Sequence, residues 1–539
     1  MIIGNLVDVR NRRVFPASIS EKDGVIIRVE EIEGQFDGYL IPGLIDSHIH
    51  IESSLLCPSR FAEVVVPCGT TAVVAAPHEI ANVLGLAGME YMSSDSSTTP
   101  LRVYFTAPSC VPTTRLETSG AVFGPAEIEM MLSRDDFIAL GELTDYPGAI
   151  SRDPEVMARI EVARRLHKPI DGHAPLLRGD ELRKYASLGI STDHECTSSE
   201  EASEKASLGM VIMVRQGTAS KDLEALAPFA KNHEFLLVSD DVSVSELIRG
   251  HLNRVLAQAV ALGIDPMHAL RAATINPALH YNLPLGSIEP GKKADLVKVS
   301  DLKSFDVEEV YVGGRLVARS GVPLFAVRPK EMVCQLLLRP KLPSDFEVAA
   351  TGRSVNARVI GLVKDEIITD SLVSELRVEN GKVMPEVEND ILRASVVNRY
   401  RDAPVSSAFV KGFGLRGGAI ASSVAHDSHN IIVVGADSED MAIAVNTLIR
   451  EGGGFCICSA GKCSTLNLRV AGLMCTKPAL EVEYVLDGLH ETARALGCAL
   501  EGPFMTMSFL SLLVIPKLKL SDKGLFDVEG FRFVDVVVS

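Results

Sequence analysis

The hydrophobic pattern of the chain changes at about residue 40. Before that point, apolar and polar positions alternate in short runs over residues 2–9, 14–21 and 25–31, and Asp23-Gly24 separates the last two runs. This alternation predicts short β-strands, and an Asp-Gly pair between two runs is typical of a tight hairpin turn. The first 40 residues are therefore expected to form a small β-structure.

From residue 40 onward, continuous apolar runs alternate with amphipathic segments. The amphipathic segments include residues 154–167, 221–232 and 244–262, whose spacing predicts helices. The apolar runs cover residues 44–50, 71–76, 102–107, 137–142, 169–173, 190–194, 211–215 and 235–240. Apolar strands separated by helices indicate a parallel sheet that is buried on both faces, and eight such units predict a (β/α)8 barrel.

The last part of the chain returns to strands and then to a mixed pattern. A helix is expected over residues 265–279, and strands at 296–299 and 310–312 could join the N-terminal strands in one sheet. Beyond residue 330, a strand at 431–434 precedes a helix for which Ser438 is a plausible N-cap and which ends at Gly452. The predicted fold class is therefore α/β. We expect three domains: a discontinuous small β domain (1–40 and 282–328), a catalytic (β/α)8 barrel (41–281) and a C-terminal α/β domain (329–539).

Composition and charge argue against nucleic acids and membranes as partners. The 539 residues are 47% apolar, which is a globular composition, and the net charge of −17 argues against a nucleic-acid binder, which needs a basic face. The first residues show neither a basic nor an apolar targeting pattern, and no uninterrupted apolar run of about 18 residues occurs, so neither a targeting segment nor a membrane-spanning helix is expected.

The cysteines indicate a reducing compartment. Ten cysteines in a chain of this length do not make a disulfide framework, and a cytoplasmic location is expected. Cys456, Cys458 and Cys463 lie close together in the sequence and could be half of a metal site. Their spacing matches no zinc or iron–sulfur pattern, so a structural role as small apolar groups is favoured.

Polar side chains stand where the apolar runs of the barrel end, which is where barrels of this kind carry their chemistry. In His48-Ile49-His50 the two histidines are two positions apart on a strand, so both rings point to one face and can reach one metal ion. Glu142, His173, His194 and Asp240 end later runs. Each of the latter histidines alone could be a capping or core residue, and Asp240 could cap a helix, although Asp241 or Ser243 can fill that role. Together these nitrogen and oxygen ligands suit Zn, Mn or Fe.

The pattern resembles the amidohydrolase superfamily and, within it, the adenine deaminase family. The resemblance rests on several segments and spans essentially the whole chain: PGLIDSHIHIESS, PHEIANV, GELTDYPG, DGHAPLL, STDHECTS, VSDD and the distal AHDSHNIIVVG. It implies two divalent metal ions, Mn or Fe, with Zn as the alternative. His48 and His50, helped by Asp240, would hold the first ion, and His173 and His194 the second. Glu142 would bridge the two ions in place of a carboxylated lysine, because no lysine occurs in residues 137–146.

The same resemblance implies hydrolytic deamination of adenine to hypoxanthine and ammonia by a metal-bound hydroxide. Coordination lowers the pKa of water to roughly 7, and a carboxylate near the water can pass its proton to the leaving ammonia. Asp240 is expected to take the proton, while Glu79, Asp241 and Glu195 are candidate shuttles or ring contacts. Any of these three could instead orient a histidine. Glu79 is favoured among them because it follows the second strand, and its alternative role is a carboxylate in the first turn of a helix.

For several other polar residues, the sequence allows more than one role. Arg215, at the end of the seventh run, could read a purine edge or form a salt bridge, and Ser109 and Cys110 are equally ambiguous. His426, Asp427 and His429 could bind a metal ion, close over the barrel mouth or form a plain turn, and the last two roles are favoured.

Two other functions compete with adenine deamination. One is another hydrolase on the same scaffold that acts on a different aminopurine, a pterin or a cyclic amide, and the other is a non-catalytic protein. The expected partner is a small-molecule substrate, adenine, with no nucleic acid and no membrane. A homo-oligomer, a dimer by the habit of the family, is also expected.

Overall fold

The structure is a computed structural model that describes residues 1–218, 220–332, 334–364 and 366–538. The chain forms two compact units. The first comprises residues 1–78, 89–110 and 123–330, and the second comprises residues 79–88, 111–122 and 331–539. Two short segments that follow barrel strands in the sequence therefore belong to the second unit.

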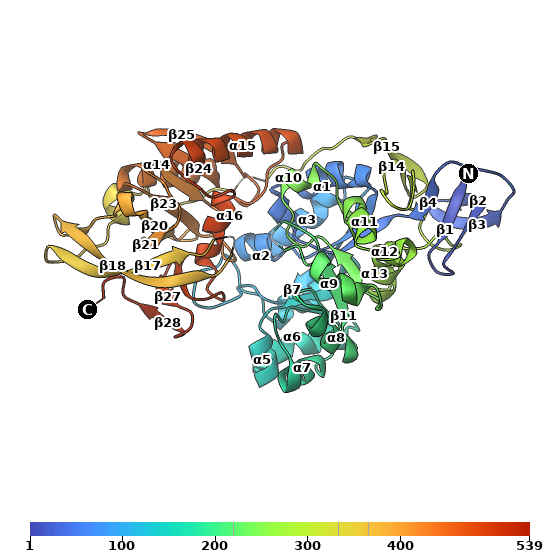
Figure 1. Cartoon of the computed structure of the whole chain (residues 1–539), viewed down its shortest axis with the longest axis horizontal. Coiled ribbons are helices and arrows are strands. Elements are labelled where there is room, and N and C mark those ends of the chain that lie inside the picture. The colour runs from blue at the N-terminus through green and yellow to red at the C-terminus, as the bar shows by residue number, and fades with distance from the viewer. Residues whose placement is uncertain (219, 333, 365, 539) are drawn as a thin grey trace. The chain divides into compact units, whose positions relative to one another are not determined.

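The first unit contains the expected barrel. Its parallel strands follow the chain in the order β5 (Leu44–Ile49), β6 (Thr70–Ala75), β7 (Arg102–Pro108), β8 (Phe137–Leu143), β9 (Ile170–Gly172), β10 (Thr192–Asp193), β11 (Val211–Arg215) and β12 (Leu236–Val238). The Ser191 amide donates to the Ile170 carbonyl and links β9 to β10. The Asp240 amide donates to the His48 carbonyl, and the His50 amide donates to Asp240, so the last strand meets the first. The prediction of an α/β barrel is confirmed, and Figure 1 shows helices α6 to α9 around it.

Two helices expected in this part of the chain are broken. Along residues 41–281, which include the segment 79–88 of the second unit, the helices are α1 (Pro58–Val65), α2 (His78–Leu84), α3 (Leu86–Ser96), α4 (Pro125–Leu132), α5 (Tyr146–Ser151), α6 (Pro154–Arg165), α7 (Gly179–Ala186), α8 (Ser199–Ser207), α9 (Leu223–Ala230), α10 (Val244–Leu247), α11 (Leu252–Ala261), α12 (Pro266–Ala272) and α13 (Ile275–His280). The segment 244–262 is interrupted because Gly250 adopts a φ of 140°. The segment 265–279 is interrupted because Pro277 has no N–H to donate to the Ala273 carbonyl, which accepts the Ile45 amide instead.

A small sheet joins the two ends of the first unit. Its strand order is β16-β15-β14-β13-β4-β1-β2-β3, with β1 (Ile2–Asp8), β2 (Arg13–Lys22), β3 (Val25–Glu31), β4 (Tyr39–Pro42), β13 (Leu296–Val299), β14 (Val307–Val312), β15 (Arg315–Arg319) and β16 (Val322–Pro323). Strands β4 and β13 pair antiparallel, and Leu6, Ile19, Leu40 and Leu296 pack in one core. Residues before and after the barrel therefore share one sheet, while the exact division into three domains stays a prediction.

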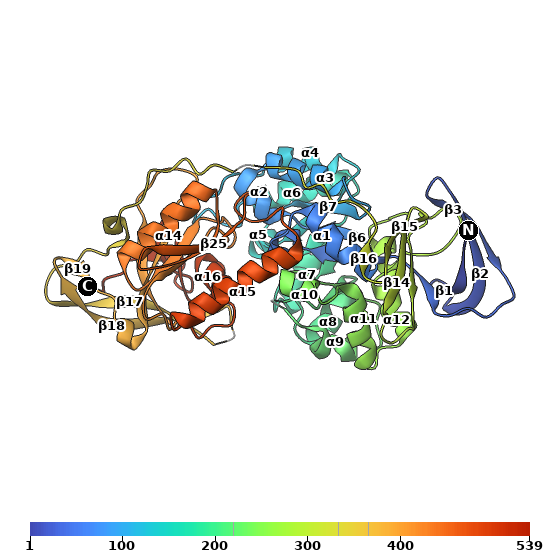
Figure 2. The same cartoon turned by 90° about the horizontal axis from the view of Figure 1, so that it is seen from above.

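The second unit is built on a mixed sheet with strand order β19-β18-β17-β21-β20-β23-β22-β24-β25. The strands are β17 (Ser354–Leu362), β18 (Thr369–Glu379), β19 (Lys382–Val383), β20 (Ile391–Val397), β21 (Ser406–Lys411), β22 (Ala419–Ser422), β23 (Ile431–Gly435), β24 (Gly454–Ser459) and β25 (Lys462–Asn467), and a further sheet contains β26 (Leu518–Ser521), β27 (Gly524–Asp527) and β28 (Arg532–Val534). The helices are α14 (Ser438–Glu451), α15 (Ala479–Ala495) and α16 (Pro503–Ser508), and Figure 2 shows α14 and α15 beside the sheet.

Helix α14 lies against the sheet through the apolar face that its sequence predicts. Met441, Val445 and Leu448 are buried in one core with Cys456 and Cys458 of β24. The N-cap is Asp437 and not Ser438, because the Asp437 carboxylate accepts the amide of Asp440, three residues further on. Burial raises the pKa of both cysteines, which keeps them protonated and fits their structural role.

The ten cysteines all lie among the described residues, and each carries a free thiol. Within the same described ranges, we find no helix whose length and apolar character would let it cross a membrane.

Candidate metal centre

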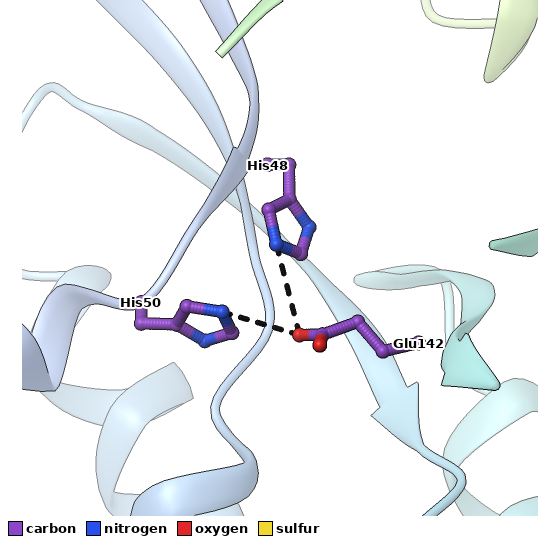
Figure 3. A group of neighbouring side chains, drawn as sticks. All are labelled: His48, His50 and Glu142. Carbon is purple, nitrogen blue, oxygen red and sulfur yellow. Dashed lines mark ion pairs between the residues drawn. The ribbon is translucent and has the colours of Figure 1, made fainter. Parts of the chain in front are cut away.

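Two histidines at the end of the first barrel strand face one carboxylate. His48 lies in β5 and His50 follows it, so their side chains leave the same face of the strand. His50 Nε2 is 3.2 Å from Glu142 Oε1, and His48 Nε2 is 3.6 Å from the same oxygen. Glu142 belongs to β8, and Figure 3 shows both rings turned toward its carboxylate. All three side chains are buried.

The hydrogen bonds of these side chains leave room for a cation. His50 Nδ1 lies 2.8 Å from the carbonyl of Ala76, which can only accept, so Nδ1 carries a proton. The Nε2 lone pair of a neutral His50 ring then points at the carboxylate oxygens of Glu142 and Asp240, 3.2 and 3.1 Å away. Acceptors that face one another in this way need a positive charge between them. Among the described residues, His48 Nε2 and Glu142 Oε1 have no hydrogen-bond partner either.

A second pair of histidines faces the other oxygen of Glu142. His173 follows β9 and His194 follows β10. His173 Nδ1 is 3.4 Å from Glu142 Oε2, and His194 Nε2 is 3.8 Å from the same atom. The two ring nitrogens are 3.1 Å apart. Glu142 thus stands between two histidine pairs with one oxygen toward each, as a bridging carboxylate would.

Asp240 adds a second carboxylate beside His48 and His50. Its Oδ1 lies 3.1 Å from His50 Nε2 and 3.4 Å from His48 Nε2, while Arg215 approaches its Oδ2 at 3.3 Å. Asp240 has a φ of 56°, a left-handed backbone that an aspartate adopts at some cost and that is frequent at functional sites. Ser243 caps α10, so the helix does not use Asp240 as its cap.

The charges in this cluster depend on one another. Burial alone would raise the pKa of Glu142, but the surrounding histidines, His50 foremost, hold it well below its usual range. Burial alone would lower the pKa of His50, but Glu142 and Asp240 raise it well above its usual value. Burial, with His48 nearby, lowers the pKa of His194 and keeps that ring neutral. Without a metal ion, a proton on His50 balances these carboxylates; a metal ion would compete with that proton for the same lone pair and displace it.

The structure also places near the cluster a residue that sequence reasoning did not choose. His78 Nδ1 lies 3.6 Å from Glu142 Oε1, and its ring centroid is 4.7 Å from that of His50. The signal was present, because His78 ends the second apolar run, but the family pattern gave it no role. Ser109, which was ambiguous, donates a hydrogen bond to the Glu142 carbonyl.

The other candidate catalytic carboxylates have distinct surroundings. Glu195 Oε1 is 3.3 Å from His194 Nε2 and is also paired with Arg215, so Arg215 forms salt bridges. Burial raises the pKa of Glu195. Asp241 accepts a hydrogen bond from the hydroxyl of Ser53. Glu79 lies in the first turn of α2, the alternative that its sequence left open, and its carboxylate is bound by two histidines of the second unit.

A buried lysine fixes the two chain segments that carry His173 and His194. Lys205 in α8 donates to the Ala174 carbonyl at 2.7 Å, to Asp193 at 2.8 Å and to Glu201 at 2.7 Å. Asp193 in turn accepts the amides of Ala174 and Glu195. The residues next to both histidines are therefore tied to one ammonium group.

We expect Lys205→Met to destabilise the first unit by about 3–5 kcal/mol, because it leaves two buried carboxylates without their counter-charge. Thermal unfolding of the metal-loaded protein should show the loss as a lower Tm. Lys184→Met on the exposed face of α7 is the matched control and should leave the Tm unchanged. Equal Tm values for the two variants would mean that Lys205 does not stabilise this region.

Comparison with known proteins agrees with this geometry. Residues 39–317 match the amidohydrolase family, and residues 366–532 match the adenine deaminase C-terminal domain. An adenine deaminase of Methanosphaera stadtmanae is 45% identical and covers 100% of this chain and 99% of its own. An adenine deaminase of Methanothermobacter thermautotrophicus is 47% identical over 100% of both chains.

The barrel and its histidine–carboxylate cluster define the class of protein: it is an amidohydrolase. The similarity to the two adenine deaminases extends over the full length of this chain and of each relative, which narrows the assignment to one family. The chain belongs to the adenine deaminase family.

Proposed function

We propose that this chain hydrolyses adenine to hypoxanthine and ammonia. The observation that carries the proposal is the bridging position of Glu142 between two histidine pairs, in a chain that is similar over its full length to adenine deaminases. His48, His50 and Asp240 would hold one divalent ion, His173 and His194 a second, and Glu142 both. Divalent ions held there would supply the Lewis acidity that makes water a nucleophile near neutral pH. Mn or Fe suits this mixed nitrogen and oxygen set, and Zn is the alternative.

Asp240 is the residue that we propose takes the proton from the attacking water. Its Oδ1 faces both His48 and His50, and Arg215 fixes its other oxygen, so the carboxylate has one orientation. A carboxylate held in this way can pass a proton on to the departing ammonia. Glu195 and Asp241 stand beside His194 and Asp240 and are the alternative carriers or ring contacts.

Glu79 is the third candidate beside Asp240, and chain connectivity supports it. It is the residue directly after His78, whose ring lies against that of His50. We propose that Glu79 exchanges a proton with the purine or binds its edge.

The proposal is tested by following ammonia release and the ultraviolet change from adenine to hypoxanthine. The purified protein is reloaded with Mn or Fe, and adenosine, guanine and dihydroorotate are assayed beside adenine. We expect turnover of adenine alone. If a metal-replete sample does not turn over adenine, the substrate assignment is wrong, and pterins and further cyclic amides become the compounds to assay.

Two general properties belong to the same proposal. Free thiols throughout the described chain support a reducing location such as the cytoplasm. A homodimer remains a prediction, which light scattering on the purified protein would decide.

A further inference from the structure

The carboxylate of Glu79 is bound at both oxygens by histidines that are distant in sequence. His426 Nδ1 lies 2.7 Å from Glu79 Oε1, and His429 Nε2 makes a short hydrogen bond with Glu79 Oε2. Glu79 and His429 are 350 positions apart, yet all three residues belong to the second unit. Glu79 is 3% exposed and His429 1% exposed. Water therefore cannot compete freely for these hydrogen bonds.

A metal ion between the three side chains would be one explanation, since they lie close enough to hold one. The hydrogen bond on the far side of the His429 ring decides against it. The backbone amide of Ala425 donates to His429 Nδ1 at 3.1 Å, so Nδ1 carries a lone pair. The proton of the neutral ring must then sit on Nε2, which faces Glu79. A metal ligand at Nε2 would require a ring without any proton.

The Nδ1 atom of His50 has the opposite kind of hydrogen-bond partner from the Nδ1 atom of His429. His50 Nδ1 faces a carbonyl oxygen, so its Nε2 is free to bind a cation. The Nδ1 of His429 faces an amide, so its Nε2 is a donor. Burial also lowers the pKa of His429, which fits a neutral ring. Glu79 therefore accepts a hydrogen bond from His429, and His426 supplies the matching contact at the other oxygen.

The turn that carries the two histidines is itself held in place. His429 has a φ of 53°, a left-handed conformation that costs a residue with a side chain about 1–2 kcal/mol. The His429 amide donates to the Ala425 carbonyl at 2.7 Å, and the Arg399 guanidinium donates to the His429 carbonyl at 3.2 Å. The His426 ring stacks on Phe509 with centroids 5.0 Å apart. Contacts other than those with Glu79 therefore hold the turn and the His426 ring in place.

We propose that His426 and His429 are positioning residues that fix the orientation of the Glu79 carboxylate for its part in the reaction. The inference rests on the proposed function, in which Glu79 exchanges a proton with the substrate or binds it. A carboxylate that is already oriented needs no rearrangement during the reaction, which is how such contacts accelerate catalysis.

Matched substitutions separate positioning from simple structural support. His429→Ala and His426→Ala each remove a donor. His429→Gln keeps an amide N–H near the position of Nε2, and His426→Asn keeps one near Nδ1. His490→Ala, on α15 beside Phe504, is the control histidine of the same unit. The metal-loaded variants are compared for kcat and KM with adenine, metal content and Tm.

We expect each alanine variant to lower kcat by about 10- to 100-fold, with metal content unchanged, as for other residues that orient a reacting group. The amide variants should recover most of that loss, and His490→Ala should resemble the parent protein. Glu79→Gln should lose at least as much kcat, and adding His429→Ala to it should change little more, because both act through one group.

Other outcomes overturn the inference in recognisable ways. Full kcat in both alanine variants would mean that the histidines do not position Glu79. Loss of one metal equivalent in His429→Ala, without recovery in His429→Gln, would show a metal site instead. Full activity of Glu79→Gln would show that the proposed role of Glu79 is wrong, and the positioning role would fall with it.

One readout does not depend on the reaction. In the zinc-loaded protein labelled with 15N-histidine, the His429 signal, assigned by its loss in His429→Gln, should show the proton on Nε2. A proton on Nδ1 would overturn the hydrogen-bond assignment. If the parent protein does not deaminate adenine but the signal is as expected, the proposed function fails while the Glu79–histidine contact stands.

Discussion

Glu142→Gln is expected to lower kcat/KM for adenine by about three orders of magnitude, equivalent to several kcal/mol of transition-state stabilisation. The reason is the position of Glu142: one oxygen faces His48 and His50, and the other faces His173 and His194. An amide carries no charge to balance two cations, and it turns an N–H toward one pair of imidazole lone pairs. Metal content per chain, measured by mass spectrometry of the dialysed protein, should fall together with turnover.

The control for this variant is Glu161→Gln, on the exposed face of α6, where the side chain is 70% exposed. It should keep the parent activity and metal content. Normal turnover and an unchanged metal content in Glu142→Gln would remove the bridging assignment and with it the two-ion arrangement.

Asp240→Asn should reduce kcat by about 10²–10⁴-fold, the range expected for loss of a positioned proton acceptor. Asp240 touches His48 and His50 through one oxygen and Arg215 through the other, so asparagine keeps the shape but loses the basicity. His173, His194 and Glu142 are unchanged by the substitution, so at least one metal equivalent should remain. Steady-state kinetics and metal analysis on the same sample would measure both effects.

Asp241→Asn and Glu195→Gln complete this experiment. Asp241 is bound to the Ser53 hydroxyl and Glu195 to Arg215, so we expect smaller losses of kcat from both. If Asp240→Asn kept most of its activity while one of the other two lost it, the proton acceptor would be that other carboxylate.

The sequence by itself determined the strands of the barrel and the positions of the candidate metal ligands along them. Each apolar run is a local pattern, and His48, His50, Glu142 and Asp240 lie where such runs end. Parallel strands in a barrel bring their ends to one side, so a list of strand ends already predicts a list of neighbours. The hairpin at Asp23-Gly24 and the apolar face of α14 were predictable for the same reason, because they depend on residues a few positions apart.

The errors fall where a local pattern competes with a backbone constraint or with an alternative cap. Residues 244–262 have helical spacing, but Gly250 takes a conformation that a helix does not allow. Residues 265–279 contain Pro277, which cannot complete the hydrogen bonds of one continuous helix. Ser438 and Asp437 are both good caps, and only the observed hydrogen bond to the Asp440 amide chooses between them.

Only the tertiary structure decided which distant side chains meet. Nothing near Lys205 in the sequence shows that its ammonium ties down the segments of His173 and His194, and nothing near Glu79 indicates His426 or His429 as its partners. The protonated nitrogen of each histidine was equally hidden, because it depends on whether a carbonyl or an amide faces the other side of the ring. Periodicity records which face of an element is buried, whereas these contacts arise from how separate elements pack.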